Sequence, residues 1–451
     1  MAFPKDFVWG VATSSYQIEG AVNADGRKPS VWDAFARKSG AIWNAQNGDK
    51  ACDHYHRYAE DIALMKELGV GAYRLSIAWP RVLPDGTGAV NAAGLAFYDK
   101  LIDALLAAKI TPWVTLYHWD HPEALHDQGG WLNPESPRWF ADYTQVVVDK
   151  LSGRVTHWFT LNEPQCFIGM GMFEGLHAPG EKRPWKEVLQ AGHHALLAHG
   201  RAVQVIRARS KKPAKIGYAP VGCLGVPASD KPEDIAAAKA GSLGVFEKGP
   251  WNSTWWMDPV YLGQYPADGL KCYADDLPQI GPNDLKTICQ PLDFCGVNIY
   301  QGPRVKSGQW GLPERCPPPE NPVLTANKWP VVPELLYWGP KWFYERYKLP
   351  VVLAENGLSC MDWVARDGKV HDPQRIDYTA RHLLALERAT SEGVSVGGYF
   401  HWSFMDNFEW AEGYKERFGL VYVDFETQKR TPKDSFYWYR DTIRNNGVSG
   451  A

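Results

Sequence analysis

Short apolar runs alternate with helix-like stretches along most of the chain. Runs rich in β-branched and aromatic residues, typical of buried strands, occupy 7–12, 72–76, 111–116, 156–161, 216–219, 294–300, 351–354 and 397–402. Helical periodicity occupies 54–68, 91–109, 137–151, 185–209, 334–347 and 373–392. Within 54–68, for example, Tyr58, Ile62 and Met65 recur at helical spacing, which indicates one buried face.

This alternation predicts an α/β fold, a (β/α)8 barrel with elaborated loops at its carboxyl-terminal face. No internal repeat, low-complexity tract or long linker interrupts it, so we expect one domain over residues 1–451. The segments 227–291 and 313–333 are expected to wall the entrance. In such barrels catalytic residues lie at the carboxyl ends of strands.

Charge and composition exclude several classes of function. Lys and Arg number 48 against 51 Asp and Glu, so no basic surplus favours a nucleic-acid partner. The start, Met1 to Asp6, lacks a secretory signal, and no apolar run reaches the about 18 residues of a membrane span. We therefore expect a cytoplasmic protein without a membrane partner. The eight cysteines include no Cys-x-x-Cys pair and are expected to be reduced thiols.

Aromatic residues are abundant, with 21 Trp, 21 Tyr and 17 Phe. Flat rings with a polar edge suit sugars, whose C–H faces stack while their hydroxyls form hydrogen bonds. Core packing can use the same residues, so this feature alone favours a carbohydrate site only weakly.

Two predicted strands end in a glutamate. Glu163 follows the fourth run within Asn-Glu-Pro, and Glu355 follows the seventh within Glu-Asn-Gly. Either one alone could be an ordinary capping or salt-bridged residue. Strands four and seven lie on nearly opposite sides of an eight-stranded barrel, so both carboxyls should point into one mouth. Two converging carboxylates are the minimal equipment for glycosidic cleavage.

The other strand ends contribute polar and aromatic side chains to the same mouth. They are Gln17, Arg74, His118, Trp119, Asn162, Asn298, Tyr300, Trp402, Glu409 and Trp410. Individually, His118 is interpretable as a structural histidine and Trp402 as core. Their joint placement at strand ends favours contact with a ligand.

Several motifs together make the chain resemble a glycoside hydrolase family 1 β-glucosidase over nearly its whole length. They are Phe-Val-Trp-Gly at 7–10 with Glu-Gly at 19–20, Tyr-Arg-Leu-Ser-Ile-Ala-Trp-Pro-Arg at 73–81, Asn-Glu-Pro at 162–164, Glu-Asn-Gly at 355–357, Asn-Phe-Glu-Trp at 407–410 and Arg-Phe-Gly-Leu-Val-Tyr-Val-Asp at 417–424. Three positions depart from the family's usual residues, namely Ala354, His121 and Ile299. We expect these to tune the site, and His121 to bear on the leaving group.

The resemblance implies catalytic roles. Glu163 would be the general acid/base and Glu355 the nucleophile of a retaining mechanism, with Arg74 beside the nucleophile. Because two close carboxylates resist ionising together, the one without a cation, Glu163, should hold the proton. Tyr300 would donate to Glu355, and Asn298 completes the catalytic set.

The resemblance also implies substrate contacts. Gln17, His118 and Trp410 would bind the 3- and 4-hydroxyls, Asn162 the 2-hydroxyl, and Glu409 the 4- and 6-hydroxyls. Trp402 would offer a stacking face, Trp119 would also bind substrate, and Trp329 would form the aromatic floor of the leaving-group site. No metal or cofactor is expected.

The predicted activity is hydrolysis of terminal β-D-glucosyl residues from cellobiose, other cello-oligosaccharides and aryl or alkyl β-glucosides. The predicted side reactions are β-galactosidase and β-fucosidase activity and transglycosylation, and the expected context is carbohydrate metabolism and cellulose degradation. Glu409 favours unphosphorylated sugars, since an anion would repel phosphate, and Glu163 favours oxygen glycosides over thioglycosides. Monomer and homo-oligomer both stay open.

Two other classes compete with this interpretation. A catalytically silent glycan-binding relative would have lost one or both glutamates. A metal-dependent barrel hydrolase could draw on His54 and His56, His118 and His121, or His193 and His194. However, zinc pairs usually lie at strand ends, whereas 54, 56, 193 and 194 lie in predicted helices.

Overall fold

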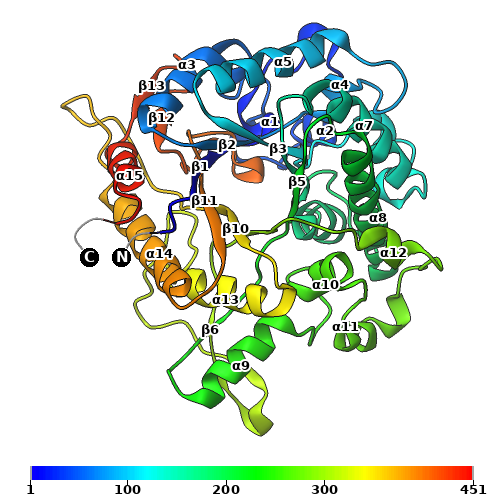
Figure 1. Cartoon of the computed structure of the whole chain (residues 1–451), viewed down its shortest axis with the longest axis vertical. Helices are drawn as coiled ribbons and strands as arrows, with labels where there is room; N and C mark the ends of the chain where they lie inside the picture. Colours follow the sequence, from blue (N-terminus) through cyan, green and yellow to red (C-terminus); the bar gives the residue numbers. More distant parts are fainter. Residues whose placement is uncertain (1–2, 449–451) are drawn as a thin grey trace.

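The computed structural model describes residues 3–448, and at its centre eight parallel strands curve into a nearly closed barrel (Figure 1). Around the sheet the order is β5-β4-β3-β2-β1-β11-β10-β7. The two edge strands are linked by Asn298 N, which donates to Pro220 O (3.0 Å), and by Gly222 N, which donates to Asn298 O (2.8 Å). The predicted fold class is confirmed. The barrel strands are β1 (Val8–Ala12), β2 (Ala72–Ser76), β3 (Thr111–Tyr117), β4 (His157–Asn162), β5 (Lys215–Ala219), β7 (Cys295–Asn298), β10 (Val351–Asn356) and β11 (Val396–Trp402).

Helices surround the barrel, and shorter elements lie in the connections (Figure 1). The longer helices are α3 (His54–Leu68), α5 (Ala92–Ala107), α7 (Ser136–Leu151), α8 (Trp185–Arg209), α9 (Pro232–Leu243), α10 (Thr254–Leu262), α13 (Leu335–Tyr347), α14 (Pro373–Ser391) and α15 (Asp434–Asn445). The shorter ones are α1 (Ser15–Ile18), α2 (Val31–Phe35), α4 (Trp79–Val82), α6 (Glu123–His126), α11 (Ala267–Cys272), α12 (Asp284–Ile288) and the π-helix η4 (Gln165–Glu174). Two small sheets comprise β6 (Val226–Pro227), β8 (Arg304–Ser307) and β9 (Pro313–Arg315), and β12 (Val421–Val423) with β13 (Arg430–Pro432).

Two strand ends where chemistry is expected differ from the prediction by two residues. The seventh barrel strand contains Glu355 and continues to Asn356, two residues beyond the predicted end, whereas the sixth stops at Asn298 and leaves Tyr300 outside. Strand β10 shifts register between Leu353 and Glu355 against β7, an irregularity of the bulge kind that re-aims side chains. Glu355 therefore lies at the end of the β10–β7 pairing, opposite Asn298, rather than in a loop.

Aromatic side chains fill the barrel interior as a separate cluster. Trp113, Phe159, Phe294, Phe400 and Trp402 are all at most 5% exposed. Space is tight: a Cβ on Gly217 would lie 2.1 Å from the ring of Phe294, so β5 needs glycine there. The barrel is thus a packed core, and its upper layer forms the floor of the mouth.

The long connections contain more structure than the sequence indicated. The segment predicted as 227–291 holds α9 to α12, and Asn252 O accepts a hydrogen bond from Gln165 beside the end of β4 (3.3 Å). The segment predicted as 313–333 begins with β9 and brings Trp329 to Tyr300, with ring centroids 5.4 Å apart. Both segments therefore reach the carboxyl-terminal face.

The two ends of the described chain meet. Phe3 N donates to Asn446 O (3.0 Å), and Trp9 Nε1 donates to Asn446 Oδ1 (2.9 Å). Met1 and Ala2, part of the start considered for a secretory signal, lie outside the described residues. None of the helices between residues 3 and 448 has the length and apolar character needed to cross a membrane. All eight cysteines are free thiols.

Candidate active site

Glu163 lies directly after β4, where the chain turns sharply into helix η4. Its φ of 48° is left-handed, a conformation that costs energy for a residue with a side chain and occurs often at functional positions. Glu163 N donates to Ala219 O (2.8 Å), and Glu163 O accepts from Cys166 N (2.9 Å) as the helix starts. The side chain is 7% exposed and points to Asn298, whose Nδ2 donates to Glu163 Oε1 (2.8 Å).

Glu355 faces the same mouth from β10 and has different partners. Its Oε1 forms an ion pair with Arg74 Nη1, and its Oε2 accepts from the hydroxyl of Tyr300 (2.8 Å). Arg74 is fully buried, with its guanidinium 4.9 Å from the centre of the Phe159 ring. The cation therefore lies beside Glu355, as the resemblance implied.

One amide connects the two glutamates. Asn162 Oδ1 accepts from Arg74 Nη2 (2.6 Å) and from Asn298 Nδ2 (3.0 Å). Its NH2 group therefore faces His118 Nε2 at 3.2 Å, which makes that nitrogen the acceptor. A neutral His118 then carries its proton on Nδ1, which is buried without a hydrogen-bond partner among the described residues. Burial and the charge of Arg74 hold the pKa of His118 well below its usual range, so the neutral ring is favoured.

The surroundings separate the two carboxyls in proton affinity. Burial and the negative charge of Glu355 raise the pKa of Glu163 to about 8. Burial also raises the pKa of Glu355, but Arg74 and the hydroxyl of Tyr300 oppose that rise. The proton shared by the pair therefore belongs on Glu163, in agreement with the charge argument from the sequence.

Gln17 and Glu409 form a second polar group beside the pair. Gln17 Nε2 contacts Asn407 Oδ1 (3.0 Å), Phe408 O (3.0 Å) and Glu409 Oε2 (3.3 Å). Burial raises the pKa of Glu409 well above its usual range, and Glu355 adds to the rise. The protonated acid is thus favoured, which weakens the sequence argument that an anionic Glu409 repels phosphorylated sugars.

Three predicted aromatic contacts lie close together on this side. Trp402 and Trp410 flank His118 at centroid distances of 5.8 and 6.0 Å, and Trp119 packs on Trp410 at 4.4 Å. Trp119 Nε1 is already used, since it donates to Asn162 O (2.9 Å). Trp119 and Trp410 have left-handed φ values of 75° and 52°. Any contact of Trp119 with a substrate must therefore use the ring rather than its N–H.

The opposite side is formed by Tyr300, Trp329 and Phe418. Their ring centroids lie 5.4 to 6.4 Å apart, and Tyr300 and Trp329 are only partly buried. The structure thus gathers all thirteen predicted site residues around one mouth, with Trp329 at its edge.

Sequence reasoning gave no role to three further residues here. Cys166 lies three residues after Glu163, and its thiol lies 3.3 Å from Glu163 Oε2. Phe418 and Asn407 were part of motifs without an assigned contact. Cys166 could have been predicted from its spacing. In a helical turn that starts at Glu163, positions i and i+3 lie on the same face.

The histidines of the competing metal interpretation lie apart and have other partners. His54 contacts Asp61 (2.7 Å), His193 contacts Tyr265 and Asp284 (both 3.0 Å), and His121 contacts Pro122 O (3.1 Å). Within residues 3–448 no three His, Cys, Asp or Glu side chains are placed to hold a metal ion together.

Comparison with known proteins assigns the family. The model of glycosyl hydrolase family 1 matches residues 1–448. Beta-glucosidase A of Thermotoga maritima is 46% identical, covering 99% of this chain and 98% of the relative, and 1,4-beta-D-glucan glucohydrolase of Thermotoga neapolitana is 45% identical, covering 99% of each. A solved structure of the Thermotoga maritima beta-glucosidase with glucoimidazole has a TM-score of 0.91 at 45% identity, covering 99% of this chain and 100% of that one. The predicted family is confirmed: the chain belongs to glycosyl hydrolase family 1.

Proposed function

We propose that this hydrolase is a retaining β-glucosidase that removes terminal β-D-glucosyl residues from cellobiose, cello-oligosaccharides and aryl or alkyl β-glucosides. One observation carries the proposal. Two buried glutamates, one directly after β4 and one in β10, face one mouth. Among residues 3–448, the only cation in direct contact with either carboxyl is Arg74 on Glu355. The relatives named above, which are called beta-glucosidases or glucohydrolases, agree with this class of enzyme.

In the first step Glu355 attacks the anomeric carbon. Arg74 keeps its carboxylate ionised, and the hydroxyl of Tyr300 holds the second oxygen so that the first is aimed at the sugar. Glu163 gives its proton to the departing oxygen, and the bond between that oxygen and the anomeric carbon breaks. The product of this step is a glucosyl ester on Glu355.

In the second step Glu163 changes its role. Esterification removes the charge of Glu355, which is one cause of the raised pKa of Glu163. Loss of that charge lowers the pKa of Glu163, which then takes a proton from water as the water oxygen bonds to the anomeric carbon. The bond between that carbon and Glu355 breaks, which releases β-glucose and restores the Glu355 carboxylate. An alcohol in place of water would give transglycosylation.

Recognition of the sugar follows from the neighbouring groups. His118 Nδ1–H is a donor without an acceptor in the described part of the chain, and Gln17 and Glu409 form a polar pair on the same side. We assign to them the 3-, 4- and 6-hydroxyls, with Asn162 near the 2-hydroxyl and Trp402 as the stacking surface. β-Galactoside and β-fucoside side activities, an unphosphorylated sugar and a cytoplasmic location are further parts of the proposal.

The testing experiment is proton NMR of the purified protein with an aryl β-glucoside, read before mutarotation. β-Glucose as the first product supports the retaining mechanism. α-Glucose as the first product would contradict it. Absence of hydrolysis of glucosides, galactosides and fucosides, with retained binding of a glucose-like inhibitor, would support the silent glycan-binding alternative instead.

A further inference from the structure

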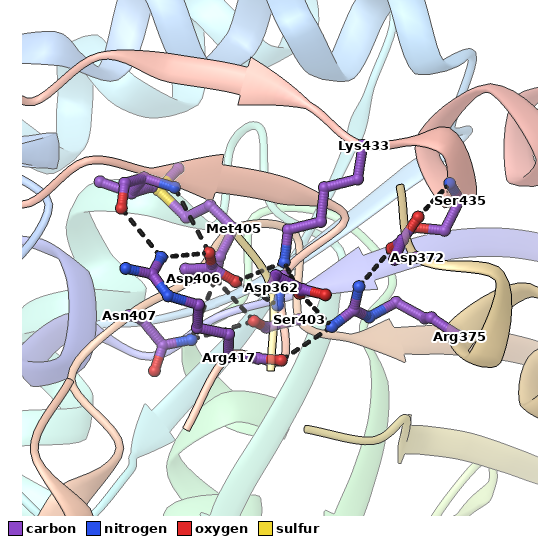
Figure 2. Close-up of polar contacts among 12 residues, drawn as sticks. Asp362, Asp372, Arg375, Ser403, Met405, Asp406, Asn407, Arg417, Lys433 and Ser435 are labelled. Atoms are coloured by element: carbon purple, nitrogen blue, oxygen red, sulfur yellow. Dashed lines mark hydrogen bonds and ion pairs between the residues drawn. The ribbon is translucent and has the colours of Figure 1, made fainter. Parts of the chain in front are cut away.

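Six charged side chains, among them Asp406 of the loop that follows β11, form a chain of ion pairs (Figure 2). Acids and bases alternate along this buried ion-pair chain, and three charges of each sign cancel. Five of the six side chains are at most 3% exposed and the sixth, Arg417, is 16% exposed. The members in order are Asp372, Arg375, Asp362, Lys433, Asp406 and Arg417.

The contacts in the middle of the chain are short and shared. Lys433 Nζ lies between Asp362 Oδ2 (2.6 Å) and Asp406 Oδ1 (2.7 Å). Arg375 Nη2 also reaches Asp362 Oδ2 (2.7 Å), and Arg417 Nη1 reaches Asp406 Oδ2 (2.7 Å). Each acid in the middle thus touches two cations, so that no charge is left without a partner.

Asp406 also holds the segment 417–424, whose motif had no assigned role. Its carboxylate accepts from Gly419 N (3.0 Å) and Val423 N (3.4 Å). A Cβ on Gly419 would lie 2.0 Å from Asp406 N, so only glycine allows this approach. The segment and the loop after β11 are therefore fixed to each other at Asp406.

The next residue, Asn407, connects Asp406 to the sugar side of the mouth. Asn407 Nδ2 donates to Ser403 Oγ (2.9 Å) and Met405 O (3.1 Å), as Figure 2 shows. Its Oδ1 accepts from Gln17 Nε2 (3.0 Å), and the same nitrogen contacts Glu409 Oε2 (3.3 Å). Asp406 is thus linked through the peptide bond to Asn407, and through the hydrogen bond of Asn407 to Gln17, to the two side chains assigned to sugar hydroxyls.

We propose that the buried ion-pair chain is a positioning device that fixes Asn407, and through it Gln17 and Glu409, and so sets the preference among sugar hydroxyls. Stability alone does not account for it, since burying ion pairs is often less favourable than packing apolar residues of the same volume. Directional bonds to Asp406, by contrast, hold a loop in one geometry. The inference rests on the proposed function, because its readout is sugar preference.

The test compares Asp406→Asn with the wild type on aryl β-glucoside and aryl β-fucoside. The substitution keeps the shape and removes the charge shared by Lys433 and Arg417. We expect kcat/KM on the glucoside to fall about tenfold more than on the fucoside, which lacks the 6-hydroxyl. The control is Asp258→Asn, which removes another buried carboxylate charge, paired with Arg346 (2.5 Å) between α10 and α13.

The outcomes separate this inference from the proposed function. A wild type inactive on every β-glycoside overturns the proposed function. An active wild type with an unchanged glucoside-to-fucoside ratio in Asp406→Asn, or the same ratio change in Asp258→Asn, overturns the positioning role alone. Where Asp406→Asn yields no folded protein, Asn407→Ala tests the same link with all six charges still paired. An unchanged ratio there also overturns the proposal.

Discussion

The two sides of the catalytic pair are built differently. On the sugar side Gln17, His118 and Asn162 are at most 2% exposed. Gln17 is held by Asn407, and Asn162 is held against His118 Nε2. On the leaving-group side Trp329 is partly buried in a loop whose Val323 is 71% exposed. A rigid polar surface discriminates hydroxyl positions, whereas an open aromatic surface accepts many shapes. We expect strict preference for the sugar and tolerance for the leaving group.

The largest effect is expected for Glu355, which every substrate requires whatever its sugar or leaving group. Glu355→Gln removes the nucleophile, so turnover should fall at least about 10⁴-fold on every glycoside whatever its leaving group. Steady-state kinetics on cellobiose and an aryl glucoside checks this. Glu320→Gln, an exposed glutamate, is the matched control. Near-normal cellobiose hydrolysis by Glu355→Gln would contradict the assignment.

The second effect depends on the leaving group. Glu163→Gln removes the proton donor, so cellobiose hydrolysis should fall about 10²- to 10⁴-fold. The first step on a dinitrophenyl glucoside should be spared, because that leaving group departs as an anion. Pre-steady-state burst kinetics measures that step. Equal losses on both substrates would show that Glu163 is not the acid.

The third effect belongs to the sugar side alone. Glu409→Ala should lower kcat/KM on glucosides about 10- to 100-fold, with a smaller loss on fucosides. Glu412→Ala, an exposed neighbour in the same turn, is the control. Equal losses on glucoside and fucoside would remove Glu409 from its assigned role.

The pH profile tests the proton assignment. Because the pKa of Glu163 is raised to about 8, the acid holds its proton below that pH and loses it above. The kcat/KM for a substrate needing acid assistance should fall about tenfold per unit above pH 8. In Glu163→Gln this basic limb should vanish. A limb that survives the substitution would place the titration elsewhere.

The smallest effect is expected on the leaving-group side. Trp329→Ala should raise KM for aryl glucosides about two- to tenfold through the lost aromatic contact, without altering the hydrolysis of the glucosyl ester. Trp310→Ala, whose ring is 87% exposed, is the control. A large fall in the ester hydrolysis rate would show that Trp329 acts on the sugar side.

Periodicity predicted the barrel because each strand and helix signal is local. Helices 54–68 and 185–209 have the predicted bounds, and the strand-end rule led to Glu163 and Glu355. The bulge in β10 that carries Glu355 into the strand depends on pairing with β7, which no local pattern encodes. The raised pKa of Glu409 likewise depends on its burial and on the charge of Glu355, which is distant in the sequence.

The contacts least accessible to sequence reasoning join residues far apart in the chain. Asp61 pairs with Arg430, and Gln17 contacts Asn407, each across more than 350 positions. Residues 407–410 and 417–424 were recognised as family motifs. Only the fold shows that Asp406, next to the first motif, binds the backbone of the second. Spacing identifies single side chains, whereas tertiary packing decides which of them form one unit.

The junction of Phe3 with Asn446 has a practical consequence. Because β1 runs toward the mouth, residues before Val8 lie at the other end of the barrel, and Asn446 meets them there. A solid support, an affinity handle or a second protein attached near this junction would leave the mouth pointing outward. A short peptide linking the two ends would also permit circular permutation, with the new cut placed in an exposed connection.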